Sequence, residues 1–138
     1  MTIVATVSTK ELKRVAAEAY EGKTLKVILC NVGLTNYNEE STIANGLTVE
    51  LPNTYGYTAF TGTIGTGSYD SVTGRYQLPV IDAAFAANNG AFTYDRVILY
   101  INDGIATYPH SVITESPSVI LQDGQTQTYR INLNTDTF

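Results

Sequence analysis

The first clear pattern of apolar and polar positions along the chain is that of an amphipathic helix near the N-terminus. Ser8 and Glu11 match a capping box, and Gly22 follows the last apolar position, where a left-handed cap is common. These signals predict a helix over about residues 9–21. Apolar side chains recur at intervals of three and four residues, as on one face of a helix: Leu12, Val15, Ala16, Ala19 and Tyr20.

After this helix the pattern changes to short extended segments. Residues 24–32 are almost continuously aliphatic, as in a strand that is buried on both faces. Residues 47–51 alternate between apolar and polar, which predicts a strand with one face in solvent. Residues 55–64 are aromatic and rich in Thr and Gly, which is typical of a bent or bulged strand. Residues 94–101 form the strongest strand pattern, and an Asn-Asp-Gly turn signal follows them.

The C-terminal third continues the strand pattern. Residues 105–114 are predicted to be extended, and a proline that removes a ladder donor confines them to a sheet edge. Residues 119–133 are predicted to form a hairpin around a Gln-Asp-Gly-Gln turn. In its second arm, the alternation directs Tyr129, Ile131 and Leu133 inward and the residues between them outward.

The glycine-rich stretch 61–79 predicts a tight turn rather than a ligand loop. No lysine lies near its glycines and no helix follows them, so neither a phosphate loop nor a dinucleotide fingerprint is matched. Asp70 suits the first position of a turn, and Gly74 suits a left-handed exit from it. Tyr69 and Tyr76 are then candidate packing partners across the hairpin.

The small residues at 81–90 favour a helical turn or a loop over the core.

The number and spacing of the predicted strands indicate the fold class and the domain organisation. Several short strands separated by turn residues indicate an all-β protein, an antiparallel β-sandwich (jelly-roll or immunoglobulin-like) preceded by one short N-terminal amphipathic helix. We expect residues 1–22 to be an arm packed on or extending from the body, and residues 23–138 to be the β-sandwich domain.

Composition adds constraints on the surface and on its partners. At 138 residues with 43% hydrophobic residues, the chain suffices for one domain with an ordinary core. Charged residues are only 15%, so much of the surface is Thr, Asn, Ser, Gln, Gly and Tyr, which suits partner contact or an extracellular particle.

The charges are distributed unevenly along the chain. Residues 1–26 carry five Lys or Arg and three Glu, whereas residues 27–138 carry three Arg and ten Asp or Glu. An acidic body argues against a nucleic-acid partner, because phosphate neutralisation needs clustered Lys and Arg. The distribution permits a basic arm to dock on an acidic neighbour, although a solvated helix face is the favoured interpretation.

Candidate chemistry is sparse. Cys30 is the single cysteine and lies in an apolar run, where a buried inert thiol is expected. His110 is the single histidine, so a zinc site or a histidine-dependent nucleophile is not predicted. The Asp residues lie at turns and strand ends, which favours structural uses such as a contact of Asp95 or Asp70 with an Arg of a neighbouring strand. We therefore expect no catalytic residue, no cofactor and no metal.

No apolar run approaches the roughly 18 residues of a membrane span, and the first residues lack the basic start and long apolar stretch of a signal peptide. We expect no membrane partner. We expect the protein to be made and kept in a cytoplasm, or to be assembled there into a particle that leaves by lysis.

Ten tyrosines and no tryptophan leave two uses for the aromatic residues open. Tyrosines can build a platform for a sugar ring, but they are also favoured in cores and at protein interfaces. The candidate interface residues are the basic residues of the predicted helix and four tyrosines of the body: Lys10, Lys13, Arg14, Tyr55, Tyr57, Tyr69 and Tyr76.

The order of segments supports a family resemblance. A short helix and L-K-V-I-L-C-N are followed by V-E-L-P-N-T-Y-G-Y-T, G-S-Y-D-S-V-T-G-R-Y-Q-L-P, F-T-Y-D-R-V-I-L-Y-I and S-V-I-L-Q-D-G-Q-T-Q-T-Y-R-I-N-L. Over nearly the whole chain, this pattern of strands and turns is similar to small virion structural proteins of tailed bacteriophages.

The resemblance implies a non-catalytic β-sandwich that acts by assembly, as a head decoration protein or as a tail, baseplate or fibre component. Its partners would be other virion proteins and copies of itself, with a host-surface glycan as a further candidate. Its place would be the virion, assembled in the host cytoplasm. The resemblance transfers no catalytic residue. The alternative is a carbohydrate-binding β-sandwich module that uses tyrosine platforms.

Overall fold

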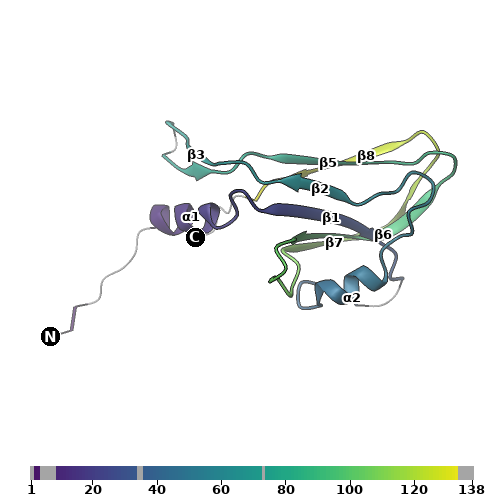
Figure 1. The fold of residues 1–138 in the computed structure, drawn as a ribbon, viewed down its shortest axis with the longest axis horizontal. Coiled ribbons are helices and arrows are strands. Elements are labelled where there is room, and N and C mark those ends of the chain that lie inside the picture. The colour runs from purple at the N-terminus through teal and green to yellow at the C-terminus, as the bar shows by residue number, and fades with distance from the viewer. Residues whose placement is uncertain (1, 4–8, 34–35, 73, 134–138) are drawn as a thin grey trace.

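The computed structural model describes residues 2–3, 9–33, 36–72 and 74–133, which form a mostly β structure with antiparallel sheets (Figure 1). The elements in chain order are α1 (Thr9–Glu18), β1 (Thr24–Cys30), α2 (Ile43–Thr48), β2 (Phe60–Thr63), β3 (Ser68–Tyr69), β4 (Tyr76–Gln77), β5 (Ile81–Ala86), β6 (Phe92–Ile101), β7 (Ser111–Leu121) and β8 (Thr126–Ile131).

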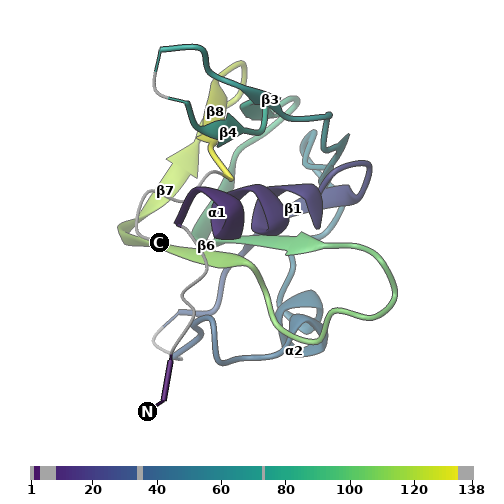
Figure 2. The same ribbon diagram turned by 90° about the vertical axis from the view of Figure 1, so that its left-hand side faces the viewer.

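Within these residues the strands form a four-stranded sheet of order β2-β1-β6-β7 and two two-stranded sheets, β5-β8 and β3-β4. The described strands do not close into a barrel. The β5-β8 sheet lies over one face of the four-stranded sheet and α2 lies over the other (Figure 1). Figure 2 shows α1 across the end of the sheets, with the β3-β4 hairpin beside it.

The continuous aliphatic pattern of β1 is explained by burial on both of its faces. Leu25, Val27 and Leu29 point into the main core, which also takes in side chains of β5, β6 and β8. Ile28 and Cys30 point the other way, into a second core beneath α2. Both sets of side chains are buried, so β1 shows no polar face.

Several predicted elements are confirmed. The helix is α1, which ends at Glu18 and is followed by a turn to Gly22, whose φ of 76° is left-handed. The capping residue Ser8 lies outside the described residues. The segment 94–101 lies within β6, and residues 24–30 of the first predicted strand form β1.

The predicted hairpin around Asp70 is also confirmed. Tyr69 pairs with Tyr76 across it, the Asp70 carboxylate accepts the Val72 amide at 2.7 Å, and Gly74 has a φ of 68°. The two tyrosine rings pack edge to face with their centroids 5.1 Å apart.

The prediction of a strand at 47–51 is wrong, because most of the alternating segment belongs to α2 or follows it. The Thr42 hydroxyl caps α2 by accepting the Asn45 amide at 3.2 Å. Gly46 faces the sheet so closely that a Cβ there would lie 2.9 Å from Ile98 Cδ1. The Thr42 cap and the close packing of Gly46 on the sheet stabilise a helix here. They outweigh the weak alternation of apolar and polar residues at 47–51.

The prediction of a helical turn or loop at 81–90 is also wrong, because residues 81–86 form β5. Ala83 and Phe85 are buried, whereas Asp82, Ala84 and Ala86 are exposed. Alanine occurs on both faces of this strand, so the sequence shows no contrast between apolar and polar positions.

The predicted hairpin at 119–133 is wrong in its pairing. Its first arm belongs to β7, which pairs with β6, whereas its second arm is β8, which pairs with β5. The turn at 122–125 therefore carries the chain from one sheet to the other. The facing of β8 is as predicted, since Ile131 and Leu133 are buried and Tyr129 is half-buried.

Two other extended predictions are confirmed only in part. Of residues 55–64, only Phe60–Thr63 form a strand, β2. Of residues 105–114, only Ser111 onward belongs to β7, which is the last strand in the order of the four-stranded sheet.

Candidate functional site

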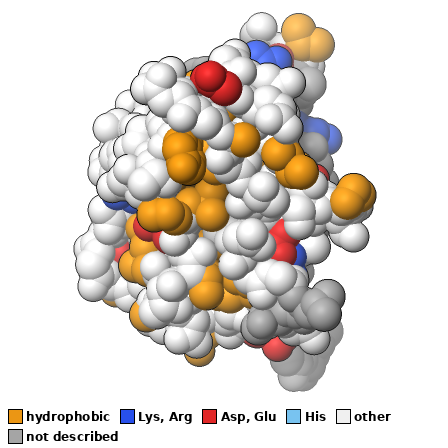
Figure 3. Space-filling view, turned by 90° about the vertical axis from the view of Figure 1, so that its right-hand side faces the viewer, with side chains coloured by type: hydrophobic (Ala, Val, Ile, Leu, Met, Phe, Trp, Pro, Cys, Tyr) orange, Lys and Arg blue, Asp and Glu red, His pale blue; other side chains and the backbone are white. Residues whose placement is uncertain are grey.

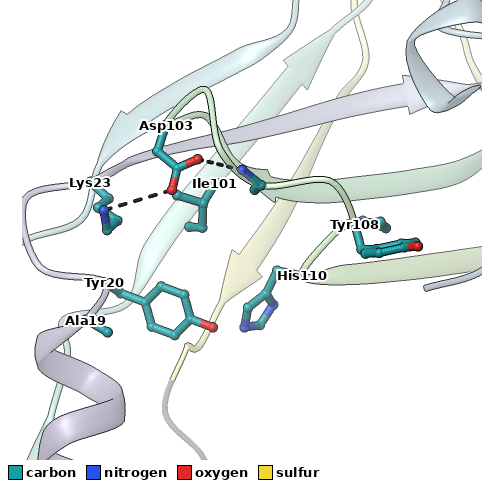
Figure 4. A pocket seen from close by; sticks show the side chains of 9 residues that line it. Ala19, Tyr20, Lys23, Ile101, Asp103, Tyr108 and His110 are labelled. Carbon is teal, nitrogen blue, oxygen red and sulfur yellow. Dashed lines mark hydrogen bonds and ion pairs between the residues drawn. The ribbon is translucent and has the colours of Figure 1, made fainter. Parts of the chain in front are cut away.

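A pocket of about 330 Å³ opens at the end of the molecule that carries α1 (Figure 4). It lies between the C-terminal turn of α1 and residues 102–110, which join β6 to β7. The lining residues are mainly aromatic or small, with one cation and one carboxylate: Ala19, Tyr20, Lys23, Ile101, Asp103, Ala106, Tyr108, Pro109 and His110.

The turn after α1 places one wall of the pocket. Gly22 adopts the left-handed conformation that lets the chain reverse, and its amide donates to the Ile64 carbonyl at 2.8 Å. The Lys23 amide donates back to the Tyr20 carbonyl at 3.1 Å. These bonds hold the Tyr20 ring beside the end of β6.

The segment 102–110 forms the opposite wall, and Asp103 organises its first turn. The Asp103 carboxylate accepts the amides of Ala106 and Ile105, each at 2.9 Å. These two hydrogen bonds, with the one from Ala106 the stronger cause, hold the pKa of Asp103 below its usual value. The remaining carboxylate oxygen lies 3.9 Å from Lys23 Nζ, which is a long and weak ion pair.

His110 faces Tyr20 across the pocket. The two ring centroids lie 5.5 Å apart in an edge-to-face arrangement. The His110 Nδ1 contacts the Ser111 hydroxyl at 2.7 Å, which fixes the orientation of the ring. Desolvation by the surrounding pocket walls lowers the pKa of His110. The pocket thus offers aromatic and aliphatic walls with a polar rim, which is suited to holding an apolar group with a polar tip.

Tyr55 lies at the opposite end of the molecule, in the loop that precedes β2. Its φ of 53° is left-handed, which is a strained conformation for a bulky residue. Its carbonyl accepts the Asn88 amide at 2.9 Å. Its ring lies directly on Gly90, where a Cβ would be 2.3 Å from Tyr55 Cδ1. The side chain is nevertheless 53% exposed, so the ring is both fixed and accessible.

Tyr57, two residues later, is a correction to the predicted interface. It is buried, and its hydroxyl donates to the Glu50 carboxylate at 2.5 Å and accepts the Leu29 amide at 3.2 Å. Phe85 stacks on its ring and Phe92 meets it edge on. Burial is the main cause that raises the pKa of this hydroxyl. Tyr57 therefore belongs to the core and cannot reach a partner.

The other predicted tyrosines lie on the β3-β4 hairpin, close to α1. Tyr69 is exposed, whereas Tyr76 donates its hydroxyl to the Glu21 carboxylate. Glu21 also accepts the Gly67 amide at 2.8 Å. The hydrogen bond to Tyr76, followed by that to Gly67, lowers the pKa of Glu21 below its usual value. These contacts fasten the hairpin to the chain just beyond α1.

Of the predicted basic residues, Arg14 forms an ion pair with Glu18 at 2.6 Å along α1. The side chains of Lys10 and Lys13 lie outside the described part of the structure. The predicted site residues thus do not converge on one place: some lie near α1, whereas Tyr55 lies at the far end.

The prediction of a buried, inert thiol holds. The Cys30 thiol is buried and donates to the Gly46 carbonyl at 3.5 Å, and burial raises its pKa to about 12. A carboxylate and a guanidinium also meet across neighbouring strands, but the pair is Asp82 and Arg130, which are 3.3 Å apart on paired positions of β5 and β8. The arginine beside Asp95 is Arg96 of the same strand.

A second pocket, of about 530 Å³, lies at the irregular pairing of β6 with β7. Asp95 and Arg96 are buried there. Asp95 accepts the Val32 amide at 2.9 Å and lies 3.7 Å from Arg96 Nη1, which in turn donates to the Asp95 carbonyl at 3.1 Å. These bonds tie the end of β1 to β6, so the pair has a structural use.

Sequence reasoning missed the pocket beside α1. In the sequence, Tyr20 belongs to the apolar face of the predicted helix, and His110, far along the chain, carries no signal for a zinc site or a nucleophile. The only local signal was the Asn-Asp-Gly turn, which predicts the turn at Asp103 but not what it faces. The contact between residues 20 and 110 depends on the pairing of β1 with β6.

Two kinds of feature are absent from the described residues. They contain no group of three or more His, Cys, Asp or Glu that could hold a metal ion. None of the helices among them is long and apolar enough to cross a membrane.

Comparison of the chain with models of known protein families, with curated protein sequences and with solved structures finds no match.

Proposed function

We propose that this protein is a non-catalytic structural protein of a tailed-phage virion and acts through contacts between subunits, as a head decoration protein or as a tail, baseplate or fibre component. One observation carries the proposal: large apolar side chains are exposed on the surface around α1. They lie on α1, on the β3-β4 hairpin and on the segment after β6: Val15, Tyr69, Val72, Ile105 and Tyr108. Exposed apolar side chains of this size suit a surface that a protein partner covers.

The fold supports an architectural role. The β5-β8 sheet and the four-stranded sheet share one core, which is the arrangement expected of a β-sandwich of the jelly-roll or immunoglobulin-like kind. The core is continuous and rich in aromatic contacts, so the body can serve as a rigid building block. Assembly would take place in the host cytoplasm, and the partners would be copies of this chain and other virion proteins.

The uses of the titratable side chains support a protein without catalytic activity. Asp70 and Asp103 hold turns, Glu21 fastens a hairpin, and Cys30 is buried with a raised pKa. His110 lies 2.7 Å from the Ser111 hydroxyl, but no carboxylate is described in contact with either ring nitrogen. A hydrolytic device of the Ser-His-Asp type needs such a third member.

A carbohydrate-binding module is the second candidate, and the exposed ring of Tyr55 favours it. An aromatic ring that is held rigidly beside amide and carboxylate side chains is suited to stacking on a sugar ring. The Asn88 amide donates to the Tyr55 carbonyl at 2.9 Å, the ring lies on Gly90, and the Asp123 carboxylate accepts the amide of Asn89, the residue before Gly90, at 3.0 Å.

The proposed function is tested on purified parent particles. Mass spectrometry should find the protein at many copies per particle, and gold-labelled antibody should mark one region of the particle in electron micrographs. Absence from purified particles, together with retention on a glycan array that Tyr55→Ala abolishes, would replace the proposal with the carbohydrate module. A hydrolase activity that a single Asp→Asn change abolishes would defeat both.

A further inference from the structure

The molecule has two distinct ends along its longest axis (Figure 1). The α1 end comprises α1, the β3-β4 hairpin and residues 102–110. The loop end comprises residues 49–59, 87–91 and 122–125. Figure 3 faces the loop end and shows hydrophobic side chains gathered across its middle. Large apolar side chains are therefore exposed at both ends.

Tyr55 is the natural anchor of the loop end. The hydrogen bond from Asn88 to its carbonyl and the contact with Gly90 hold its backbone in a left-handed conformation. A protein keeps a strained residue in place only where its surroundings enforce it, and such residues cluster at binding sites. A ring that is ordered before binding loses little conformational entropy when it is buried by a partner.

The pocket at the α1 end has the size and chemistry to receive such a ring. Its volume of about 330 Å³ exceeds that of a phenol side chain, and Ile101, Pro109 and Tyr20 supply apolar wall. The rings of Tyr20 and His110 already pack edge to face, with their centroids 5.5 Å apart, so an entering ring would lie beside this pair rather than between its two members. Figure 4 shows both rings on the rim of an open site.

One cation of the pocket is matched by acidic residues at the loop end. The three loop-end segments contain two acids, Glu50 and Asp123, and no Lys or Arg. Lys23 lines the pocket, and its 3.9 Å approach to Asp103 leaves it only weakly neutralised. An approaching loop end would place a carboxylate-bearing surface against this cation, which favours correct orientation and faster association.

We propose that Tyr55 of one copy inserts into the pocket lined by Tyr20 and His110 of the next copy, so that the chain associates head to tail. The inference rests on the proposed function, because it names the surface through which the subunits would meet. A contact between two different surfaces of the same chain is heterologous. It closes into a ring if the rotation between copies permits, and otherwise it extends into a filament.

Two variants test the contact. Tyr55→Asn removes the ring at the loop end, and Asn tolerates the left-handed conformation of this position. Ala106→Arg fills the pocket at the α1 end from an exposed position, and the backbone amide that Asp103 accepts is retained. Ile120→Ser, which removes a different exposed apolar side chain, is the matched control. Circular dichroism and thermal melting confirm that each variant is folded.

Sedimentation velocity over a concentration series should show wild-type species larger than a monomer. Tyr55→Asn and Ala106→Arg should each weaken association by about 30-fold, as expected for truncation of an aromatic anchor, whereas Ile120→Ser should not. An equimolar mixture of the two defective variants should form a dimer and nothing larger, because one supplies an intact pocket and the other an intact Tyr55.

Three results would overturn the inference. One is a mixture that stays monomeric while the wild type associates, and another is an Ala106→Arg variant that associates as well as the wild type. A wild type that remains monomeric at millimolar concentration also overturns it. Presence of that monomer in purified particles would still leave the proposed function standing, with a different virion protein as the partner.

Discussion

The hydroxyl of Tyr57 replaces a missing ladder partner of β1. In the described residues the pairing of β1 with β2 ends at Val27, which lies opposite Phe60. Beyond it, Leu29 finds its partners in the loop that precedes β2: its carbonyl accepts the Leu51 amide at 3.0 Å, and its amide donates to the Tyr57 hydroxyl at 3.2 Å. Removal of that single oxygen is therefore a direct test of how the loop end is attached to the sheet.

Tyr57→Phe keeps the ring against Phe85 and deletes the hydroxyl. Leu29 is fully buried, so its amide would lose its partner without gaining water, at a cost of about 1–3 kcal/mol. Glu50 is partly exposed and can turn to solvent, so its lost hydrogen bond adds at most about 1 kcal/mol. We expect a total loss of about 3 kcal/mol, which for a chain of 138 residues lowers Tm by about 10 °C.

The assay is thermal and urea unfolding followed by circular dichroism. Tyr55→Phe is the matched control, because it deletes a hydroxyl from an exposed tyrosine of the same loop and should change stability by less than about 0.5 kcal/mol. If Tyr57→Phe falls within about 0.5 kcal/mol of the wild type, the Leu29 amide does not depend on this hydroxyl and the reasoning is refuted.

Three further predictions concern single residues. Glu21→Gln should remove the part of the stability that depends on the lowered Glu21 pKa. This contribution is present above the ordinary pKa of 4.5 and is lost as the pH falls below it. The free energies of unfolding of the variant and the wild type should therefore converge as the pH is lowered from 6 to 3. A difference between them that stays constant over this range would refute the assignment. Gly22→Ala should destabilise the fold by about 1 kcal/mol through the left-handed φ of 76° alone, since a Cβ there would meet nothing within 4 Å. Gly22→Asn should cost less, because Asn adopts this conformation more readily. Equal melting temperatures for all three proteins would contradict this. The Cys30 thiol, with its pKa raised to about 12, should resist a thiol-specific disulfide reagent at pH 8 until urea unfolds the chain, and fast reaction of the native protein would count against its burial.

The elements that could be predicted are those whose own residues carry the signal. The period of α1, the left-handed Gly22 and the Asp70 turn are local features, and each is found where the sequence places it. β6 was predictable because six of the eight residues at 94–101 are β-branched, aromatic or aliphatic, and a turn follows them, which leaves few alternatives.

The elements that failed depend on contacts between distant residues. β5 is a strand because Ala83 and Phe85 meet the main core, and small exposed residues hide that alternation. The segment at 119–133 divides between two sheets because β8 finds its partner in β5 rather than in β7. The pocket beside α1 joins Tyr20 to His110, and no spacing within either segment predicts that meeting.

The central claim is that the protein acts through contacts between subunits of a particle. The most direct measurement is a cryo-electron microscopy map of the purified parent particle into which the fold is fitted. The account predicts repeated copies of this fold with the surface around α1 covered by a neighbouring subunit. A map that accounts for all repeated density without this fold, or that leaves the α1 surface facing solvent in every copy, would contradict it.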